Sequence, residues 1–301
     1  MKKVLGLAGV LLLASAMAAH AETVLVDMKG PGSGNPFWAA VEAGAREKAA
    51  ELGVDLVVLA PTQESDVQSQ IAQIEDQLAK KIDAMALAPT DPNALAPIVE
   101  EAKKRGVGVV FIDTKGINLD TTFIGTNNEV GAALAADYIC NNVAKGSEVV
   151  ILQGIITQST GQARADGSKK GMAACGLNIV AEQPADWDTA KAQSAMENIL
   201  TGHPNIKAVF ASNDNMALGA VQAIKSAGMG GKIVVVGFDA NPNAAAAVLA
   251  GDMAATVAQN PTNMGRFGVE YALKVKRGEK IPPVIDTGTV LVTKENAADY
   301  Q

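Results

Sequence analysis

The chain has 301 residues, with 25 Lys and Arg against 32 Asp and Glu, and a net charge of −7 at pH 7. Because no block of basic residues occurs, nucleic acid and an anionic membrane surface are excluded as expected partners. Aromatic residues make up only 4% of the chain, so those that gather just after a predicted strand are candidates for a site.

The first 21 residues have the three parts of a secretory signal peptide. A basic Met1-Lys2-Lys3 start is followed by an apolar run over residues 4–18 and by the small-residue site Ala19-His20-Ala21. The apolar run is too short and wrongly flanked for a membrane span. We therefore predict cleavage of residues 1–21 and export to the periplasm, with a mature chain that starts near Glu22.

Short aliphatic runs alternate with helical segments along the rest of the chain. The predicted strands are Thr23–Met28, Val54–Ala60, Ala84–Ala88, Val107–Ile112, Thr122–Ile124, Glu148–Leu152, Asn178–Glu182, Ala208–Ala211, Ile233–Phe238 and Ala254–Ala258. The predicted helices include Trp38–Leu52, Val67–Lys80, Asn93–Lys104, Glu129–Val143, Ala190–Leu200, Asn215–Ser226 and Thr262–Lys276. Apolar runs without alternation are typical of parallel strands covered on both faces. The pattern predicts a doubly wound α/β protein, and its length suits two domains.

The stretch Gly34-Asn35-Pro36-Phe37-Trp38 follows the first predicted strand. Two aromatic rings beside an amide suit a flat, hydroxyl-bearing ligand, because ring faces stack on C–H surfaces while the amide bonds polar edges. The same residues also fit a helix start, with Asn35 as N-cap and Pro36 as the first helical residue. The glycines before Asn35 do not form a dinucleotide fingerprint, since G-x-G-x-x-G would need a glycine at position 35.

Two segments of the chain share the order glycine, aliphatic strand, aspartate. They run from Gly106 to Asp113 and from Gly231 to Asp239. Ligands of open α/β sheets sit beyond the carboxyl ends of the strands, so two similar domains would present both aspartates to one cleft. A carboxylate accepts from two adjacent hydroxyls, which suits a polyhydroxylated ligand. The alternative is that each aspartate caps the next helix.

The loops after the other strands add further polar and aromatic candidates. Arg164 lies near the start of a helix, where the helix dipole repels its charge. A ligand or a carboxylate in a cleft would explain this arginine, and an exposed position on the helix is the alternative. The candidate site residues from the loops are Asn35, Phe37, Trp38, Asp113, Arg164, Trp187, Asn213, Asp239 and Gln259. They contain no nucleophile–base pair, so they predict binding rather than catalysis.

Neither a metal nor a cofactor is expected. His203 is the only histidine after export, so a zinc site or a histidine-dependent triad has little to build from. Cys140 and Cys175 are the only cysteines, and both lie near the ends of predicted helices that flank one strand. In an oxidising compartment two cysteines often pair, whereas two buried free thiols are the alternative.

At this point the mature chain resembles, over nearly its full length, a periplasmic sugar-binding protein of ABC importers, in the ribose/allose-binding group. The motifs that carry the resemblance are Asn35-Pro36-Phe37-Trp38, Ala88-Pro89-Thr90-Asp91, Phe111-Ile112-Asp113, Leu152-Gln153-Gly154, Gln183-Pro184-Ala185-Asp186-Trp187-Asp188, residues 210–219, Val236-Gly237-Phe238-Asp239 and Thr256-Val257-Ala258-Gln259-Asn260-Pro261.

The resemblance implies two Rossmann-like lobes, a periplasmic binding protein type I fold, joined by three hinge strands that close on a sugar. The crossovers would fall near Thr126, Gln259 and Thr289. The N-terminal lobe would comprise residues 23–126 and 260–288, and the C-terminal lobe residues 127–259 and 289–301. Phe37 or Trp38 and Trp187 would stack on the sugar ring, and the polar candidates would bond its hydroxyls.

Two departures from the ribose-binding pattern predict a different ligand. Thr114 stands where those relatives have an arginine, and Ala88 stands where they have an asparagine. Lys29, before the glycine loop, is the candidate replacement, as in the allose-like branch. Unmatched polar groups in a site cost about 1–3 kcal/mol each, so such a site would discriminate against ribose. We expect another aldose, a deoxy sugar or a linear sugar alcohol.

The resemblance also implies the partners. The expected function is ligand capture and delivery to an ABC permease by a protein that acts as a monomer. Presentation of the ligand to a chemoreceptor is the alternative, because the same closed form could serve both. A sugar-modifying enzyme is the least favoured interpretation, since the site candidates include no cofactor fingerprint and no general-base histidine.

Overall fold

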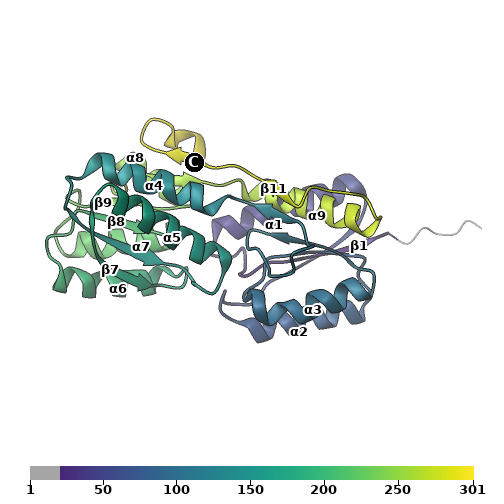
Figure 1. Ribbon diagram of the computed structural model, residues 1–301. Helices are drawn as coiled ribbons and strands as arrows, with labels where there is room; N and C mark the ends of the chain where they lie inside the picture. The colour runs from purple at the N-terminus through teal and green to yellow at the C-terminus, as the bar shows by residue number, and fades with distance from the viewer. Residues whose placement is uncertain (1–20) are drawn as a thin grey trace, which may run out of the picture.

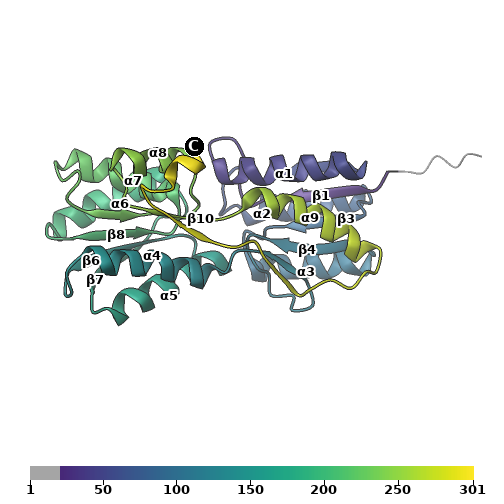
Figure 2. The same ribbon diagram turned by 90° about the horizontal axis from the view of Figure 1, so that it is seen from above.

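The computed structural model describes residues 21–301 as two α/β units side by side (Figures 1 and 2). The predicted signal peptide, apart from its last residue, lies outside the described residues. We call the unit built on the six-stranded sheet the N-lobe and the unit built on the four-stranded sheet the C-lobe. The predicted doubly wound α/β class is confirmed, because every strand pair within these two sheets is parallel and helices cover both faces.

The N-lobe sheet has the strand order β11-β5-β4-β3-β1-β2. Its strands are β1 (Thr23–Asp27), β2 (Asp55–Leu59), β3 (Ala84–Leu87), β4 (Gly108–Ile112), β5 (Phe123–Gly125) and β11 (Val284–Asp286), and its helices are α1 (Pro36–Leu52), α2 (Val67–Ala79), α3 (Pro92–Lys104) and α9 (Pro261–Lys276). Helices α1 and α9 cover one face of the sheet and α2 and α3 the other (Figure 1). The apolar runs of the sequence thus become strands buried on both faces.

Two glycines set how closely α1 and α9 pack. A Cβ on Gly44 of α1 would lie 2.0 Å from the backbone oxygen of Thr262, and a Cβ on Gly265 of α9 would lie 1.9 Å from that of Val41. Any larger residue at either position would force the helices apart. This contact fastens a segment from late in the chain onto the first helix of the N-lobe.

The C-lobe sheet has the strand order β7-β6-β8-β9. Its strands are β6 (Glu148–Gln153), β7 (Asn178–Pro184), β8 (Ala208–Ala211) and β9 (Val234–Val236), and its helices are α4 (Asn128–Asn142), α5 (Ser159–Ala174), α6 (Thr189–Gly202), α7 (Asp214–Ser226) and α8 (Pro242–Ala250). An antiparallel pair, β10 (Thr256–Ala258) and β12 (Val290–Val292), lies beside β9, and a 3-10 helix spans Ala297–Tyr300. Helices α4 and α5 cover one face, and α6, α7 and α8 cover the other (Figure 2).

The chain passes between the lobes three times. It leaves the N-lobe after β5, returns after β10, and leaves again between β11 and β12. The predicted crossovers near Thr126, Gln259 and Thr289 fall within these three connections. Figure 2 shows the last segment, in yellow, running back from the N-lobe to the C-lobe.

Most helix boundaries follow the local signals in the sequence. Asn35 caps α1 by accepting from the Phe37 backbone N–H, and Asp91 and Asn260 cap α3 and α9 in the same way. The sequence did not predict α8, β11 or β12. The two strands are three residues each and partly exposed, and α8 is alanine-rich, so none of the three has a clear apolar period.

Candidate functional site

One cavity between the lobes brings together all ten residues that the sequence singled out. They are Lys29, Asn35, Phe37, Trp38, Asp113, Arg164, Trp187, Asn213, Asp239 and Gln259, and Glu64 and Thr160 complete the lining. The cavity holds about 280 Å³ of empty space. That is close to the lower limit of about 300 Å³ for small-molecule pockets, so the space suits a ligand of a few carbon atoms rather than a large one.

The strand ends explain why residues so far apart in the sequence meet. Lys29, Asp113 and Asp239 each follow the carboxyl end of a parallel strand region, at the edges where the two sheets face each other. Asp113 has φ 56° and Asp239 φ 121°, conformations that non-glycine residues rarely adopt. Backbone strain of this kind is typical of ligand sites, because it aims a side chain that regular structure would direct elsewhere.

Lys29 is the cation of the N-lobe wall. Its ammonium lies 3.0 Å from Asp113 Oδ2 and 3.6 Å from Glu64 Oε2. It also donates to Gln158 Oε1 at 3.0 Å and Thr160 Oγ1 at 3.4 Å, both from the C-lobe. An ammonium has three protons, so these four acceptors occupy all of them. A hydrogen bond from Lys29 to a ligand would have to replace one of these contacts.

Lys29 stands where the sequence comparison expected a lost cation to be replaced. Thr114 is fully buried, and its hydroxyl donates to Asp113 Oδ2 at 2.7 Å. The Asp113 carboxylate therefore receives a hydroxyl from the next residue and a charge from Lys29. The other oxygen of Asp113 makes no hydrogen bond within residues 21–301.

Arg164 is the cation of the C-lobe wall and is 3% exposed, so the surface alternative is wrong. Its Nε donates to Asn128 Oδ1 and one Nη to the Ser212 backbone oxygen, both at 2.7 Å. The same Nη lies 3.4 Å from Asp239 Oδ1, and the guanidinium lies over the ring of Phe238 at 3.8 Å. All four partners belong to the C-lobe, so the lobe itself orients this arginine.

The indole N–H groups of both tryptophans bond the protein. Trp38 Nε1 donates to Glu64 Oε1 at 2.8 Å, and Trp187 Nε1 donates to Gln158 Oε1 at 2.9 Å. Phe37 meets Trp38 edge-on, with ring centroids 5.0 Å apart. Gly154 is needed beside Trp187, since a Cβ there would lie 2.2 Å from the indole ring. These contacts fix the rings and leave their apolar faces for packing.

Burial governs the charges of the cavity. It raises the pKa of Asp239 to about 7, against the opposing effect of Arg164 nearby. Burial likewise raises the pKa of Glu64, although Lys29 and the Trp38 N–H favour its ionised form. The pKa of Asp214, which lies behind the site, is raised well above its usual range by burial and by Asp239. The cavity thus holds its carboxylates near the point of protonation.

Sequence reasoning missed Glu64, Thr160 and Gln158. Glu64 and Thr160 lie in loops after β2 and β6, so the rule that selected the other candidates applies to them as well. Gln158 does not line the cavity but is fully buried beside it. No local pattern marks this glutamine, because its partners come from distant parts of the chain.

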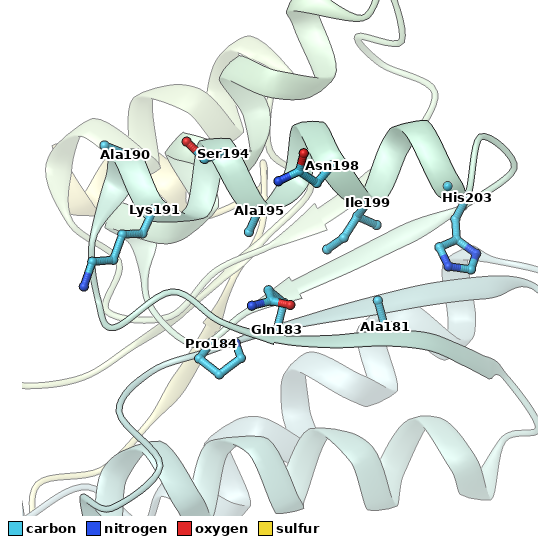
Figure 3. Close-up of a pocket in the computed structure, with 11 residues that line it drawn as sticks. Ala181, Gln183, Pro184, Ala190, Lys191, Ser194, Ala195, Asn198, Ile199 and His203 are labelled. Carbon is cyan, nitrogen blue, oxygen red and sulfur yellow. The ribbon is translucent and has the colours of Figure 1, made fainter.

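Other features of the described residues lie apart from this cavity. Cys140 and Cys175 form a disulfide between α4 and α5, so the paired alternative holds. A larger surface hollow of about 1210 Å³ lies between β7 and α6 (Figure 3). Figure 3 shows Gln183 and Pro184 of β7 on one side and Lys191, Ser194 and Asn198 of α6 on the other. Only the C-lobe lines that hollow, and no buried charge faces it.

Two searches of the described part of the chain found nothing. Within residues 21–301, no three His, Cys, Asp or Glu side chains are grouped in a way that would hold a metal ion. None of the helices in this range combines the length and the apolar character needed to cross a bilayer.

Fold and cavity together define a class of protein. Two α/β lobes are linked by three chain crossings, and they enclose a small space lined by aromatic rings, carboxylates, amides and two cations. This is the architecture of a solute-binding protein.

Comparison with known proteins specifies the class. A model of the periplasmic binding protein domain matches residues 28–280. The ribose import binding protein RbsB of Salmonella typhimurium is 37% identical over 262 residues, which cover 87% of this chain and 88% of that protein. The D-allose-binding periplasmic protein of Escherichia coli is 36% identical over 289 residues, which cover 92% of this chain and 91% of that one.

A solved structure agrees with the fold. An ABC transporter periplasmic solute-binding protein from Actinobacillus succinogenes with bound D-allose has a TM-score of 0.87 and 33% identity, and the match covers 93% of this chain and 100% of that chain. The chain described above belongs to the periplasmic binding protein family.

Proposed function

We propose that this chain captures a monosaccharide or small sugar alcohol and delivers it to the permease of an ABC importer. The observation that carries the proposal is the set of polar atoms around the cavity that have no hydrogen-bond partner within residues 21–301. The acceptors are Asp113 Oδ1, Asp239 Oδ2 and Gln259 Oε1, and the donors are Asn35 Nδ2 and one Nη of Arg164. A hydroxyl donates and accepts at once, so a mixed set of this kind matches a polyhydroxylated ligand.

Aromatic faces complete the match. The rings of Phe37, Trp38 and Trp187 line the same cavity, and the indole N–H groups are already bonded. The C–H faces of a sugar or polyol stack on such rings while its hydroxyls reach the polar atoms. The relatives named for ribose and for allose support this ligand class.

The ligand we favour is an aldose other than ribose, a deoxy sugar or a C4–C6 sugar alcohol. Thr114 and Ala88 supply neither the arginine nor the amide of the ribose-binding pattern, and Thr114 is committed to Asp113. A ligand that needs those donors would leave its own hydroxyls unmatched.

A thermal-shift screen of the mature protein tests the proposal. The panel comprises D-ribose, D-allose, D-arabinose, D-fucose, erythritol and xylitol. A ligand at 100 times its dissociation constant adds about 2.7 kcal/mol of stability, so a true ligand raises the melting temperature measurably. No shift with any sugar or polyol would contradict the proposed function.

Calorimetry on variants tests the site itself. We expect Arg164→Ala and Asp239→Ala each to weaken binding at least about tenfold, because each leaves a buried charged partner unmatched. Lys170→Ala, an exposed cation on the same helix as Arg164, is the control and should bind as the wild type does. Wild-type affinity in both site variants would overturn the assignment of the residues.

Closure and export complete the proposal. The three connections near Thr126, Gln259 and Thr289 act as a hinge, and a ligand that touches both walls shifts the population to the closed form. The protein works as a monomer in the periplasm after cleavage before Glu22. Intact mass of the exported protein and size-exclusion chromatography test these two points.

The same closed form is the feature a chemoreceptor would recognise, and pull-down against the permease and a chemoreceptor periplasmic domain separates the two roles. We further propose that the protein binds its ligand without chemical change. Recovery of the intact sugar after prolonged incubation is the expected result.

A further inference from the structure

Gln158 occupies an unusual place at the start of α5. It is the N-cap residue of that helix, yet its side chain makes no capping hydrogen bond. Side chains at this position commonly accept from the first backbone N–H groups of their own helix. The side chain of Gln158 is fully buried instead, and it extends from the C-lobe to the N-lobe.

Four hydrogen bonds hold this amide. Nε2 donates to the backbone oxygens of Glu64 at 3.2 Å and Thr90 at 3.0 Å. Oε1 accepts from Lys29 Nζ at 3.0 Å and from Trp187 Nε1 at 2.9 Å. Two donor protons and two lone pairs are all that an amide offers, so Gln158 is saturated. Three of its partners belong to the N-lobe and one, Trp187, belongs to its own lobe.

The next two residues extend the contact. Ser159 Oγ accepts from the backbone N–H of Lys115 at 2.8 Å, and Thr160 Oγ1 lies 3.4 Å from Thr114 Oγ1. Consecutive residues 158–160 of the C-lobe therefore each bond the N-lobe. Of the three, only Thr160 lines the cavity.

The N-lobe partners are themselves fixed in place. The backbone N–H and the hydroxyl of Thr90 both donate to Gln70 Oε1 at 2.8 Å. Gln70 in turn donates to Asp27 Oδ1 and to the Ala88 backbone oxygen. The acceptor that receives Gln158 is thus positioned by a buried network of the N-lobe before the C-lobe reaches it.

From this geometry we propose, on the basis of the function proposed above, that Gln158 is a positioning residue for ligand capture. It fastens the two lobes over the ligand without touching the ligand, and so sets how long the ligand stays bound. Because its contacts are lobe to lobe, it stabilises the closed form for every ligand that fits the cavity. It acts on the dissociation rate rather than on the choice of ligand.

Stopped-flow kinetics on matched glutamine variants test this proposal. The probe is the sugar or polyol of the panel above that gives the largest thermal shift with the wild type. We expect Gln158→Ala to raise the dissociation rate constant at least about tenfold, since it removes three hydrogen bonds between the lobes. The association rate constant should change by less than about threefold, and the order of affinities across the panel should stay the same.

Two further variants guard the interpretation. Gln158→Met keeps the length of the side chain and removes its hydrogen bonds, so it should behave as Gln158→Ala does and exclude a packing defect. Gln162→Ala is the control, because Gln162 is exposed on the same helix and bonds Asp166 of its own lobe. An unchanged dissociation rate in both Gln158 variants, or a changed order of affinities, would overturn the proposal.

A second measurement keeps the test independent of the proposed function. Spin labels at Glu75→Cys on α2 and Lys170→Cys on α5, both exposed, report the separation of the lobes in the ligand-free protein. We expect Gln158→Ala to lower the population with the short distance. If no sugar binds the wild type, the proposed function fails, and equal short-distance populations in wild type and variant would then reject the latch separately.

Discussion

The two walls of the cavity hold their cations in opposite ways. Arg164 has all its protein partners in its own lobe, namely Asn128, Ser212, Asp239 and the ring of Phe238. Lys29 divides its partners between Asp113 and Glu64 of the N-lobe and Gln158 and Thr160 of the C-lobe. The C-lobe wall is therefore complete before closure, whereas the N-lobe wall is completed by closure.

This difference predicts an order of events. A ligand first meets a pre-oriented guanidinium, so the C-lobe supplies most of the intrinsic affinity at low ordering cost. The N-lobe then adds contacts that form only when the lobes meet, and these slow the release of the ligand. Each wall is open to a separate experimental test.

The disulfide gives the largest expected effect, and it tests what keeps the C-lobe wall ordered. Cys140 and Cys175 join α4, which carries Asn128, to α5, which carries Arg164, across a sequence separation of 35 residues. Replacing both cysteines by alanine should lower the free energy of unfolding by about 4 kcal/mol, from the loop entropy of the unfolded chain. Chemical denaturation measures this change.

Ligand affinity of the same variant sharpens the comparison. We expect a change of less than about threefold, because hydrogen bonds and packing hold Arg164 without the disulfide. A tenfold loss would show that the wall depends on the crosslink.

Removal of the two cations should separate the walls directly. We expect Arg164→Met to weaken binding at least about 100-fold and Lys29→Met about tenfold, because only the first leaves an already ordered carboxylate and two other acceptors unpaired. Calorimetry gives the affinities, and stopped-flow should place the Lys29→Met effect in the dissociation rate. Circular dichroism checks that both variants fold. Equal losses in the two variants would remove the distinction between the walls.

Asp27 provides a pH test beneath the N-lobe wall. Burial raises the pKa of this carboxyl to about 8, with one hydrogen bond from Gln70 acting against the shift. The folded state therefore holds a proton that the unfolded state releases near pH 4, so Asp27 lowers stability as the pH rises from about 4 to 8. We expect Asp27→Asn to melt higher than the wild type at pH 8, with a smaller difference at pH 5. Thermal denaturation across this range measures it, and parallel curves would refute the assignment.

The smallest effects are expected at the two indoles. Trp38→Phe and Trp187→Phe keep an aromatic face and each lose one hydrogen bond, to Glu64 and Gln158 respectively. One such bond contributes about 0.5–1.5 kcal/mol, so affinity should fall by roughly fivefold or less. Calorimetry should give the larger loss for Trp187→Phe, since that indole supports the residue that joins the lobes. A larger loss for Trp38→Phe would assign more of the affinity to the N-lobe wall.

The sequence predicted the architecture well because the period of apolar residues and the caps are local signals. The alternation of strands and helices identified the doubly wound class, and the residues after the strands proved to surround one cavity. Asp113 and Asp239 could be paired in advance because two equivalent sheets present equivalent strand ends to one cleft.

What the sequence could not supply depends on distance in space. Spacing alone could not decide whether Cys140 and Cys175 pair, because pairing requires the 6.1 Å Cα separation that helix packing creates. Gln158 reads as an ordinary loop residue, and only its contacts with Glu64 and Thr90 in the other lobe reveal a role.

The late return of the chain to the N-lobe has a consequence for biogenesis. Helix α9 and strand β11 lie C-terminal to most of the C-lobe, yet α9 covers the buried face around Val24, Val41 and Ala45. A chain that emerges amino end first cannot complete the N-lobe until residue 286 has followed. Contacts so distant in sequence form slowly. The topology therefore delays folding of the first-made lobe, which keeps an exported chain threadable while it crosses the membrane.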